Sequence, residues 1–227
     1  IGLNDVYLAY LTGFKKINDL QTVGFGLRYF SLGSIQFTDP NGTPLNTGRP
    51  NEFELSGAYA RKLSEKLSAA VTGKFIYSNL AAGNIVNGEV IEPGIAGAAD
   101  FSMTYKTPIK VSKGESDLTI GLAITNIGSK ITYTNSLFRD FLPANFGLGG
   151  AWTINFDTHN SLTFTTDINK MLVPTPCQGL DCDQDRDGRA DYKDVSPVSA
   201  IFSSWADAPE GLSEEIKEFT YSVGTEY

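Results

Sequence analysis

Alternation of apolar residues with small or polar residues recurs along almost the whole chain. In the segment 145–156, Phe146, Leu148, Trp152 and Ile154 fall on one parity, and small or polar residues fall on the other. Because successive side chains of a strand point to opposite faces, such a segment has one apolar and one polar face. Every second connection between these segments is short. This pattern is typical of an antiparallel transmembrane β-barrel of the bacterial outer-membrane type, and it predicts an all-β fold.

The same pattern predicts about nine strands. Their expected ranges are 4–14, 21–32, 51–62, 67–79, 95–106, 117–128, 144–156, 161–172 and 217–227. The shorter connections are 15–20, 63–66, 107–116 and 157–160, and they alternate with longer ones at 33–50, 80–94, 129–143 and 173–216. Bacterial barrels have short periplasmic turns and long extracellular loops, so the longer connections are predicted to be extracellular. A soluble β-sandwich fits this strict alternation less well.

Several charged residues within the strands, Arg28, Lys74, Asp100 and Asp167, fall on the polar parity. An arginine or lysine that faced lipid at the bilayer midplane would cost roughly 2–4 kcal/mol. We therefore expect the polar parity to face the lumen and the apolar parity to face lipid.

Composition limits the function classes. The 227 residues carry a formal net charge of −8, which argues against binding nucleic acid or anionic lipid through a basic patch. The mean hydropathy is −0.14, and no segment approaches the roughly 20 apolar residues of a spanning helix. The lone His159 is expected in a turn without a catalytic partner, so the sequence does not indicate an enzyme.

The ends of the chain bear on its organisation. We expect a single barrel domain over residues 1–227, but bacterial single-chain barrels have an even number of strands. An odd sheet with open edges cannot close in lipid. The chain is therefore expected to be an internal fragment of a mature protein, with strands missing before Ile1 and after Tyr227.

The longest connection, 173–216, contains a calcium-binding pattern. Counted from Asp183, carboxylates stand at positions 1, 3, 5, 9 and 12 with glycine at position 6, which matches the EF-hand loop except for aspartate at the last position. Ca²⁺ prefers six to eight oxygen ligands, and the position-7 ligand is a backbone carbonyl. The predicted ligands are Asp183, Asp185, Asp187, Arg189 through its carbonyl, Asp191 and Asp194. An acidic, solvated loop is the alternative.

Two cysteines, Cys177 and Cys182, stand at the start of this loop. In an exported chain they favour a disulfide that fixes the entry to the calcium loop. A pair of free thiols or a metal site is the alternative.

Several stretches resemble a known family. They are 4–10, 27–39, 50–53, 57–64, 207–211 and 214–224, of which Leu27-Arg28-Tyr29-Phe30-Ser31-Leu32-Gly33 is an example. Together they resemble the PorV (LptO) family of the Bacteroidetes type IX secretion system, which is related to the FadL barrels. The resemblance implies an outer-membrane barrel of about fourteen strands that is not an enzyme.

The resemblance also implies a function. Members of this family bind the C-terminal signal domains of secreted cargo at the translocon pore subunit and carry the cargo to the sortase and attachment complex. A FadL-type transporter of hydrophobic small molecules is the alternative.

Aromatic and aliphatic residues in the longer connections are candidate anchors for a protein partner, because such residues commonly dominate interfaces. The candidates are Phe37, Leu45, Phe202 and Trp205. The stretch 198–206 is expected to form a short amphipathic helix, which either contacts a partner or packs against its own barrel.

Overall fold

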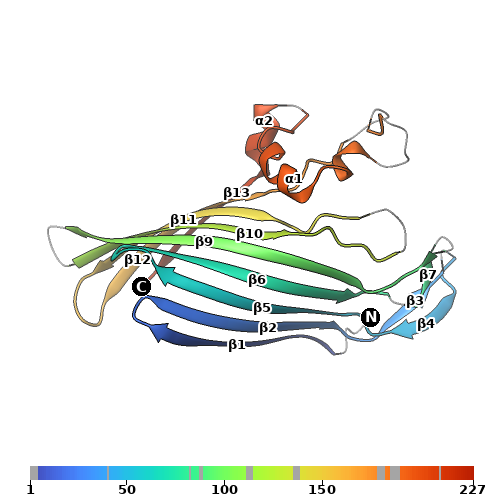
Figure 1. Cartoon of the computed structure of the whole chain (residues 1–227), viewed down its shortest axis with the longest axis horizontal. Helices are drawn as coiled ribbons and strands as arrows, with labels where there is room; N and C mark the ends of the chain where they lie inside the picture. The colour runs from blue at the N-terminus through green and yellow to red at the C-terminus, as the bar shows by residue number, and fades with distance from the viewer. Residues whose placement is uncertain are drawn as a thin grey trace.

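A nine-stranded antiparallel sheet forms the body of the chain (Figure 1). The computed structural model describes residues 5–39, 41–81, 83–86, 89–110, 115–134, 139–177, 182–184, 190–209 and 211–227. Each strand pairs with its neighbour in sequence, in the order β1-β2-β5-β6-β9-β10-β11-β12-β13. The strands are β1 (Val6–Asn18), β2 (Gln21–Leu32), β5 (Asn51–Lys62), β6 (Leu67–Asn79), β9 (Gly94–Lys110), β10 (Glu115–Gly128), β11 (Asn145–Asn155), β12 (Ser161–Met171) and β13 (Phe219–Glu226).

Shorter elements lie in the long connections. Two hairpins, which the alternation did not predict, are β3 (Ile35–Thr38) with β4 (Pro44–Gly48), and β7 (Ile85–Val86) with β8 (Glu89–Val90). The β12–β13 connection contains η1 (Asp191–Lys193), α1 (Pro197–Ser203), α2 (Leu212–Glu215) and η2 (Ile216–Glu218). None of the helices in the described part of the chain is long and apolar enough to cross a membrane.

The nine predicted strands and the alternation of short and long connections are confirmed. The expected connection 107–116 is wrong in its bounds, because β9 continues to Lys110 and β10 begins at Glu115. Pro108 lies within this extension and pairs with Asp117 of β10. Because β6 pairs with β9 no further than Tyr105, the missing N–H of Pro108 interrupts no ladder. The first strand also runs further than expected, to Asn18.

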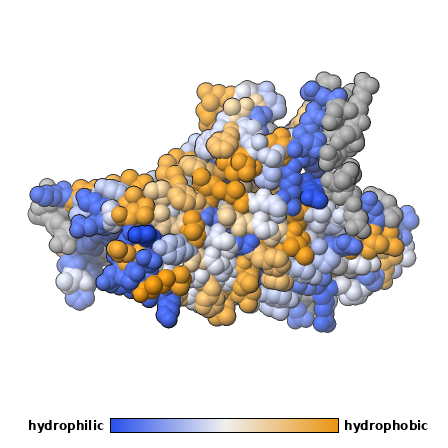
Figure 2. Space-filling model, viewed as in Figure 1, coloured by the Kyte–Doolittle hydropathy of each residue, from blue (hydrophilic) through white to orange (hydrophobic). Residues whose placement is uncertain are grey.

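The register assigns the two faces of the sheet as the alternation predicted. Arg28 lies opposite Glu54, and Lys74 forms an ion pair with Asp100, all on one face that we call the polar face. Most large hydrophobic residues of β2 to β13 gather on the other, apolar face, with Phe30 and Ile76 as exceptions on the polar face. Examples on the apolar face are Phe25, Leu55, Phe75, Leu148, Trp152 and Phe164. In Figure 2 hydrophobic surface extends over the middle of the sheet, and hydrophilic residues gather toward both ends.

The polar face is hollowed. A cavity of about 510 Å³ is lined mainly by its small and polar residues, including Thr119, Gly121, Gly149 and Asp167. Strand β1 departs from the pattern, because its register places Tyr10 on this face, opposite Arg28. Among the described residues β1 and β13 each pair with one strand, so the sheet is an open wall of the kind that builds a barrel.

Candidate functional site

The long connections gather at one end of the sheet, and the β3–β4 hairpin forms a surface there (Figure 1). A Cβ atom at Gly48 would lie 2.3 Å from a ring carbon of Phe37, so the glycine makes room for that ring. The side chain of Gln36 crosses the hairpin, accepting a hydrogen bond from Thr47 Oγ1 at 3.0 Å and donating one to the Asn46 carbonyl at 3.2 Å. Leu45 is 59% exposed. The hairpin therefore holds Phe37 against its own backbone and presents Leu45 outward.

Asp39 fixes the turn of this hairpin. Its Oδ1 atom accepts hydrogen bonds from the backbone N–H groups of Thr43 at 2.7 Å and Asn41 at 2.9 Å. These bonds, that of Thr43 first, lower the pKa of Asp39 below its ordinary value. Gly42 follows with φ of +85°, a conformation that favours glycine.

The β10–β11 connection folds onto the polar face. Ile131 and Leu142 are buried with Ala96 of β9, which lies on that face. Tyr133 donates a hydrogen bond to Ser78 Oγ at 3.0 Å, and Ser78 donates one to Glu52 at 2.5 Å. This segment therefore covers the polar face near the end of the sheet.

Lys74 lies at the centre of a polar network that holds this connection. Its Nζ atom is 2.7 Å from Asp100 Oδ2 and donates a hydrogen bond to Asn126 Oδ1 at 2.9 Å. Asn126, at a β-bulge with φ of +58°, donates its backbone N–H to Asp100 and its side-chain amide to the Pro143 carbonyl. The ion pair is only 13% and 17% exposed, so each charge depends on the other.

A cavity of about 590 Å³ remains between this connection and the polar face. Apolar side chains of Phe30, Ile131 and Phe141 line it together with the Arg28–Glu54 ion pair, whose shortest distance is 3.1 Å. A site of this size and mixed lining is suited to a small amphipathic molecule.

The β12–β13 connection instead covers the apolar face. Lys170 of β12 pairs with Phe146 of β11 and Phe219 of β13, so it stands on the apolar parity. Its side chain is 0% exposed, because Glu215 Oε1 and Glu218 Oε2 from the connection lie 2.6 and 2.5 Å from Lys170 Nζ. The two carboxylates thus satisfy a lysine that would otherwise point away from the polar face.

Thr175 joins the other end of the connection to this cluster. Its hydroxyl donates to Asp207 Oδ1 at 3.0 Å and lies 2.9 Å from Glu218 Oε1, and its backbone N–H donates to Asp207 Oδ2 at 3.0 Å. Burial alone would raise the pKa of Glu218, but its bonds to Lys170 and Thr175 and the Lys170 charge outweigh that effect and lower it. The carboxylate oxygens of Asp207, Glu215 and Glu218 lie within 4.8 Å of one another, and the Lys170 ammonium supplies the positive charge among them.

A further ion pair ties this connection to the β10–β11 connection. Lys193 Nζ lies 2.8 Å from Asp140 Oδ1, and this bond raises the pKa of Lys193. Lys130 donates to the Lys193 backbone carbonyl and lies 4.3 Å from the centroid of the Phe141 ring. The two connections are therefore linked at this end of the sheet.

The predicted calcium ligands Asp185, Asp187 and Arg189 lie outside the described residues. Of the rest, the Asp191 carboxylate accepts hydrogen bonds from the Gln184 backbone N–H at 3.2 and 3.3 Å, and the Asp191 N–H donates to the Cys182 carbonyl at 2.7 Å. Among the described residues, Asp183, Asp191 and Asp194 do not form a cluster of three carboxylates. Gln184 and Asp191, at positions 2 and 9 of the pattern, are therefore in direct contact.

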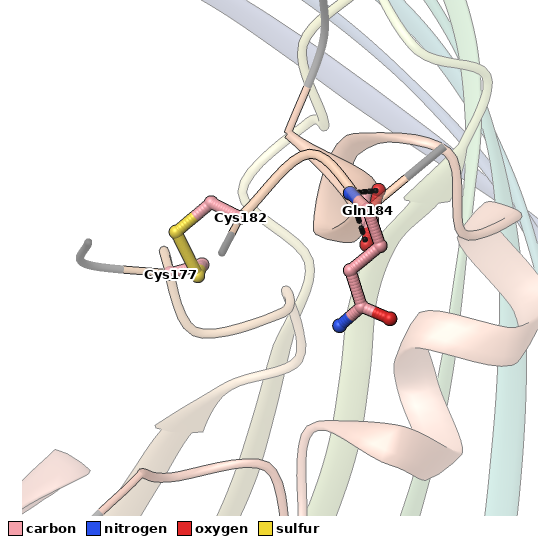
Figure 3. The surroundings of a disulfide bond; sticks show 4 residues. Cys177, Cys182 and Gln184 are labelled. Atoms are coloured by element: carbon pink, nitrogen blue, oxygen red, sulfur yellow. Dashed lines mark hydrogen bonds between the residues drawn. A yellow bond between two sulfur atoms is a disulfide. The ribbon is translucent and has the colours of Figure 1, made fainter. Parts of the chain in front are cut away.

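Cys177 and Cys182 form a disulfide, with 5.6 Å between their Cα atoms (Figure 3). Figure 3 shows the disulfide and, along the same loop, the Gln184 backbone nitrogen bonded to the Asp191 carboxylate. The bridge therefore stands directly before the calcium-binding pattern.

The predicted partner anchors do not form one surface. Phe37 and Leu45 belong to the β3–β4 hairpin, whereas Phe202 lies on α1 and Trp205 follows it. The Trp205 ring is 5.2 Å from that of Phe146 and 6.1 Å from that of Phe219, both on the apolar face. Trp205 thus contacts its own sheet, and Phe202 is 75% exposed.

Sequence reasoning missed the cluster around Lys170. The available signal was a lysine on the apolar parity of a strand, two residues after Ile168. Nothing in the pattern showed which acidic residues of a connection of more than forty residues would reach it.

The comparisons with known proteins agree with this architecture. No curated protein matches the chain. A family model described as "Type IX secretion system protein PorV" matches residues 2–178, which include the strands β1 to β12. The match covers well over half of the chain, which therefore belongs to the PorV family of type IX secretion system proteins.

Proposed function

We propose that this chain binds the C-terminal signal domains of secreted cargo at the translocon pore subunit and delivers the cargo to the sortase and attachment complex. Its family makes it an outer-membrane component of the type IX secretion system. The observation that carries the proposal is that the elaborate connections gather at one end of the wall, opposite four short turns. The end with the long connections is the extracellular end in this proposal.

The β3–β4 hairpin is the proposed contact for the cargo. Leu45 projects from it, and Phe37 and the Gln36 side chain stiffen the hairpin behind that residue. A preorganised apolar residue loses little conformational entropy when a partner covers it. The other candidates, Phe202 and Trp205, lie on the opposite face of the wall from the cavity.

We also propose that the loop of Asp183, Asp185, Asp187, Arg189, Asp191 and Asp194 binds Ca²⁺. The support is the ligand spacing together with the disulfide that precedes it. The ion would draw the carboxylates together and stiffen the connection, which is a structural role.

A photo-activatable amino acid in place of Leu45 tests the cargo contact in cells that express the full-length protein. The matched control replaces Leu63, which is 55% exposed in a short turn at the other end of the wall. We expect cross-links from position 45, and not from position 63, to proteins that carry the secretion signal domain. Equal cross-linking at both positions, or none to such proteins, would contradict the proposal.

The cavity of about 590 Å³ supports a second candidate function, transport of hydrophobic small molecules. Apolar side chains line much of it, and Arg28 with Glu52, Glu54 and Asp140 supplies charged groups, so it fits a ligand with an apolar chain and a polar head better than a purely polar one. Extraction of the purified full-length protein with organic solvent, followed by mass spectrometry, distinguishes the two functions. A stoichiometric lipid with no protein partner would favour transport.

A further inference from the structure

We propose that α1 and the turn after it rest on the outer wall of the barrel and place Val198 and Phe202 in the lipid of the outer membrane. The inference rests on the proposed orientation of the wall, with its apolar face toward lipid. It concerns a contact with lipid, and it does not depend on which protein the other connections bind.

The first step is where the segment lies. Lys170 shares the apolar parity with Ile168 and Phe164, yet it is fully buried beneath Glu215 and Glu218. The end of the β12–β13 connection, at Glu215 and Glu218, therefore occupies the position beside β12 that lipid would occupy next to Ile168 and Phe164.

Aromatic contacts extend this attachment toward α1. Trp205 packs edge-on against Phe146, with 5.2 Å between the ring centroids, and its ring centroid is 6.1 Å from that of Phe219. Phe146 on β11 and Phe219 on β13 both pair with Lys170 and point to the apolar face. Trp205 therefore lies on the outside of that face.

The second step is the polarity of α1. The residues buried against the rest of the chain are the small Ala200 and Ser204, each 0% exposed and four positions apart. Val198 and Phe202, also four positions apart, are 61% and 75% exposed. A surface helix in water buries its large apolar residues. Helix α1 exposes two of them, Val198 and Phe202, and leaves Ile201 half-buried.

Helix α1 also contains no charged residue between its Ser196 cap and Ser203. Charges are costly in contact with acyl chains, and tryptophan is enriched at the boundary between headgroups and chains. Val198 and Phe202 give the exposed side of α1 a large apolar surface. The exposed side of α1 is therefore apolar and uncharged, like the apolar face of the wall next to it.

The test measures contact with lipid directly. The full-length protein is reconstituted with lipids whose acyl chains carry bromine, after Phe202→Cys has been labelled with a bimane fluorophore under non-reducing conditions that preserve Cys177–Cys182. Leu148→Cys, on the apolar face, is the positive control, and Leu45→Cys, on the β3–β4 hairpin, is the negative one. All three side chains are at least 40% exposed, so labelling removes no buried packing.

We expect brominated lipid to quench the label at position 202 several-fold more than the label at position 45, and to a degree approaching that at position 148. Adding Lys170→Met should reduce quenching at 202 and leave it unchanged at 148, because the substitution releases the segment but not the wall. Quenching at 202 no greater than at 45 would overturn the inference.

The proposed cargo contact and the proposed lipid contact can be refuted independently of each other. Loss of cross-linking at Leu45 would leave the lipid result at position 202 unaffected, because no cargo is present in the reconstituted membrane. Quenching at 148 confirms that the protein has inserted with its apolar face toward lipid, so a negative result at 202 concerns the segment alone.

Discussion

Lys170 shows how far the position of a single residue in a strand can mislead. Period-two alternation assigns it correctly to the apolar face, and a lysine there suggests a poorly tolerated charge. The structure gives it two carboxylates within 2.6 Å and removes it from solvent. Alternation predicts the direction of a side chain. It contains no information on which distant segment will cover that side chain.

The cluster around Lys170 should make the attachment of the β12–β13 connection sensitive to acid. Because the folded-state pKa of Glu218 is lowered, its stabilising contribution is complete above the unfolded-state pKa and is lost as the pH falls through the folded-state pKa. We therefore expect limited proteolysis within 173–218 to accelerate only when the pH falls below the ordinary glutamate pKa of 4.5, while the strands stay resistant. Gel analysis of the fragments across a pH series measures this.

Glu218→Gln is the matched variant for that series. It should cleave faster at neutral pH and show a flatter dependence on pH, since its side chain no longer titrates. Lys193→Met removes the more exposed ion pair with Asp140. Exposed ion pairs contribute about 0–1 kcal/mol to stability, so this variant should have a smaller effect on the cleavage rate. A proteolysis rate that does not change between neutral and acidic buffer would show that Glu218 does not hold the connection.

At the scale of elements, two neighbouring connections fold in opposite directions. The β10–β11 connection lies on the polar face through Ile131, Leu142 and the Asn126–Pro143 hydrogen bond. The β12–β13 connection lies on the apolar face through Lys170. Neither direction could be predicted from the sequence, because irregular segments have no hydrophobic period and their contacts are made with residues far away in the chain.

The calcium-binding pattern makes an element-scale prediction. Ca²⁺ should slow proteolysis of the connection 173–216 in the purified full-length protein, and Asp185→Ala together with Asp187→Ala should remove the protection. Losing two of the carboxylate ligands would weaken a site whose extracellular counterparts bind at about 10⁻⁴–10⁻³ M. The measurement is the cleavage rate with Ca²⁺ and with a chelator.

A carboxylate outside the pattern provides the control for this experiment. Glu89→Ala, at an exposed position in β8, should leave the response to Ca²⁺ unchanged. Equal protection of the double variant and the unmodified protein would show that the loop is only an acidic, solvated segment.

At the scale of the whole molecule, alternation was enough to predict the sheet. It predicted nine strands and, outside β1, most residues of each face, and the strands pair with their neighbours in sequence, for which few other topologies exist. It was less accurate where a strand is paired on one side only, as at the end of β9 near Pro108. The open β1 and β13 edges follow from the same nine strands.

Two adjacent residues test which face of the wall meets lipid. Leu122 pairs with Leu148 on the apolar face, and Ala123 pairs with Gly147 on the polar face. Leu122→Arg should cost roughly 2–4 kcal/mol of stability in the membrane and block assembly, whereas Ala123→Arg should be tolerated in the hollow of the polar face. Heat-modifiable mobility in gels reports assembly. If Ala123→Arg blocked assembly and Leu122→Arg did not, the face that carries Ala123 would be the one that meets lipid.

Isolation of the full-length protein from its native outer membrane in mild detergent tests the central claim most directly. Quantitative mass spectrometry identifies what remains bound to it, and a variant that lacks the β3–β4 hairpin is purified in parallel. The proposed function predicts secreted proteins that share a C-terminal signal domain, together with the translocon pore subunit, and it predicts loss of the cargo from the hairpin variant. A protein that carries only lipid, or the same cargo with and without the hairpin, would contradict it.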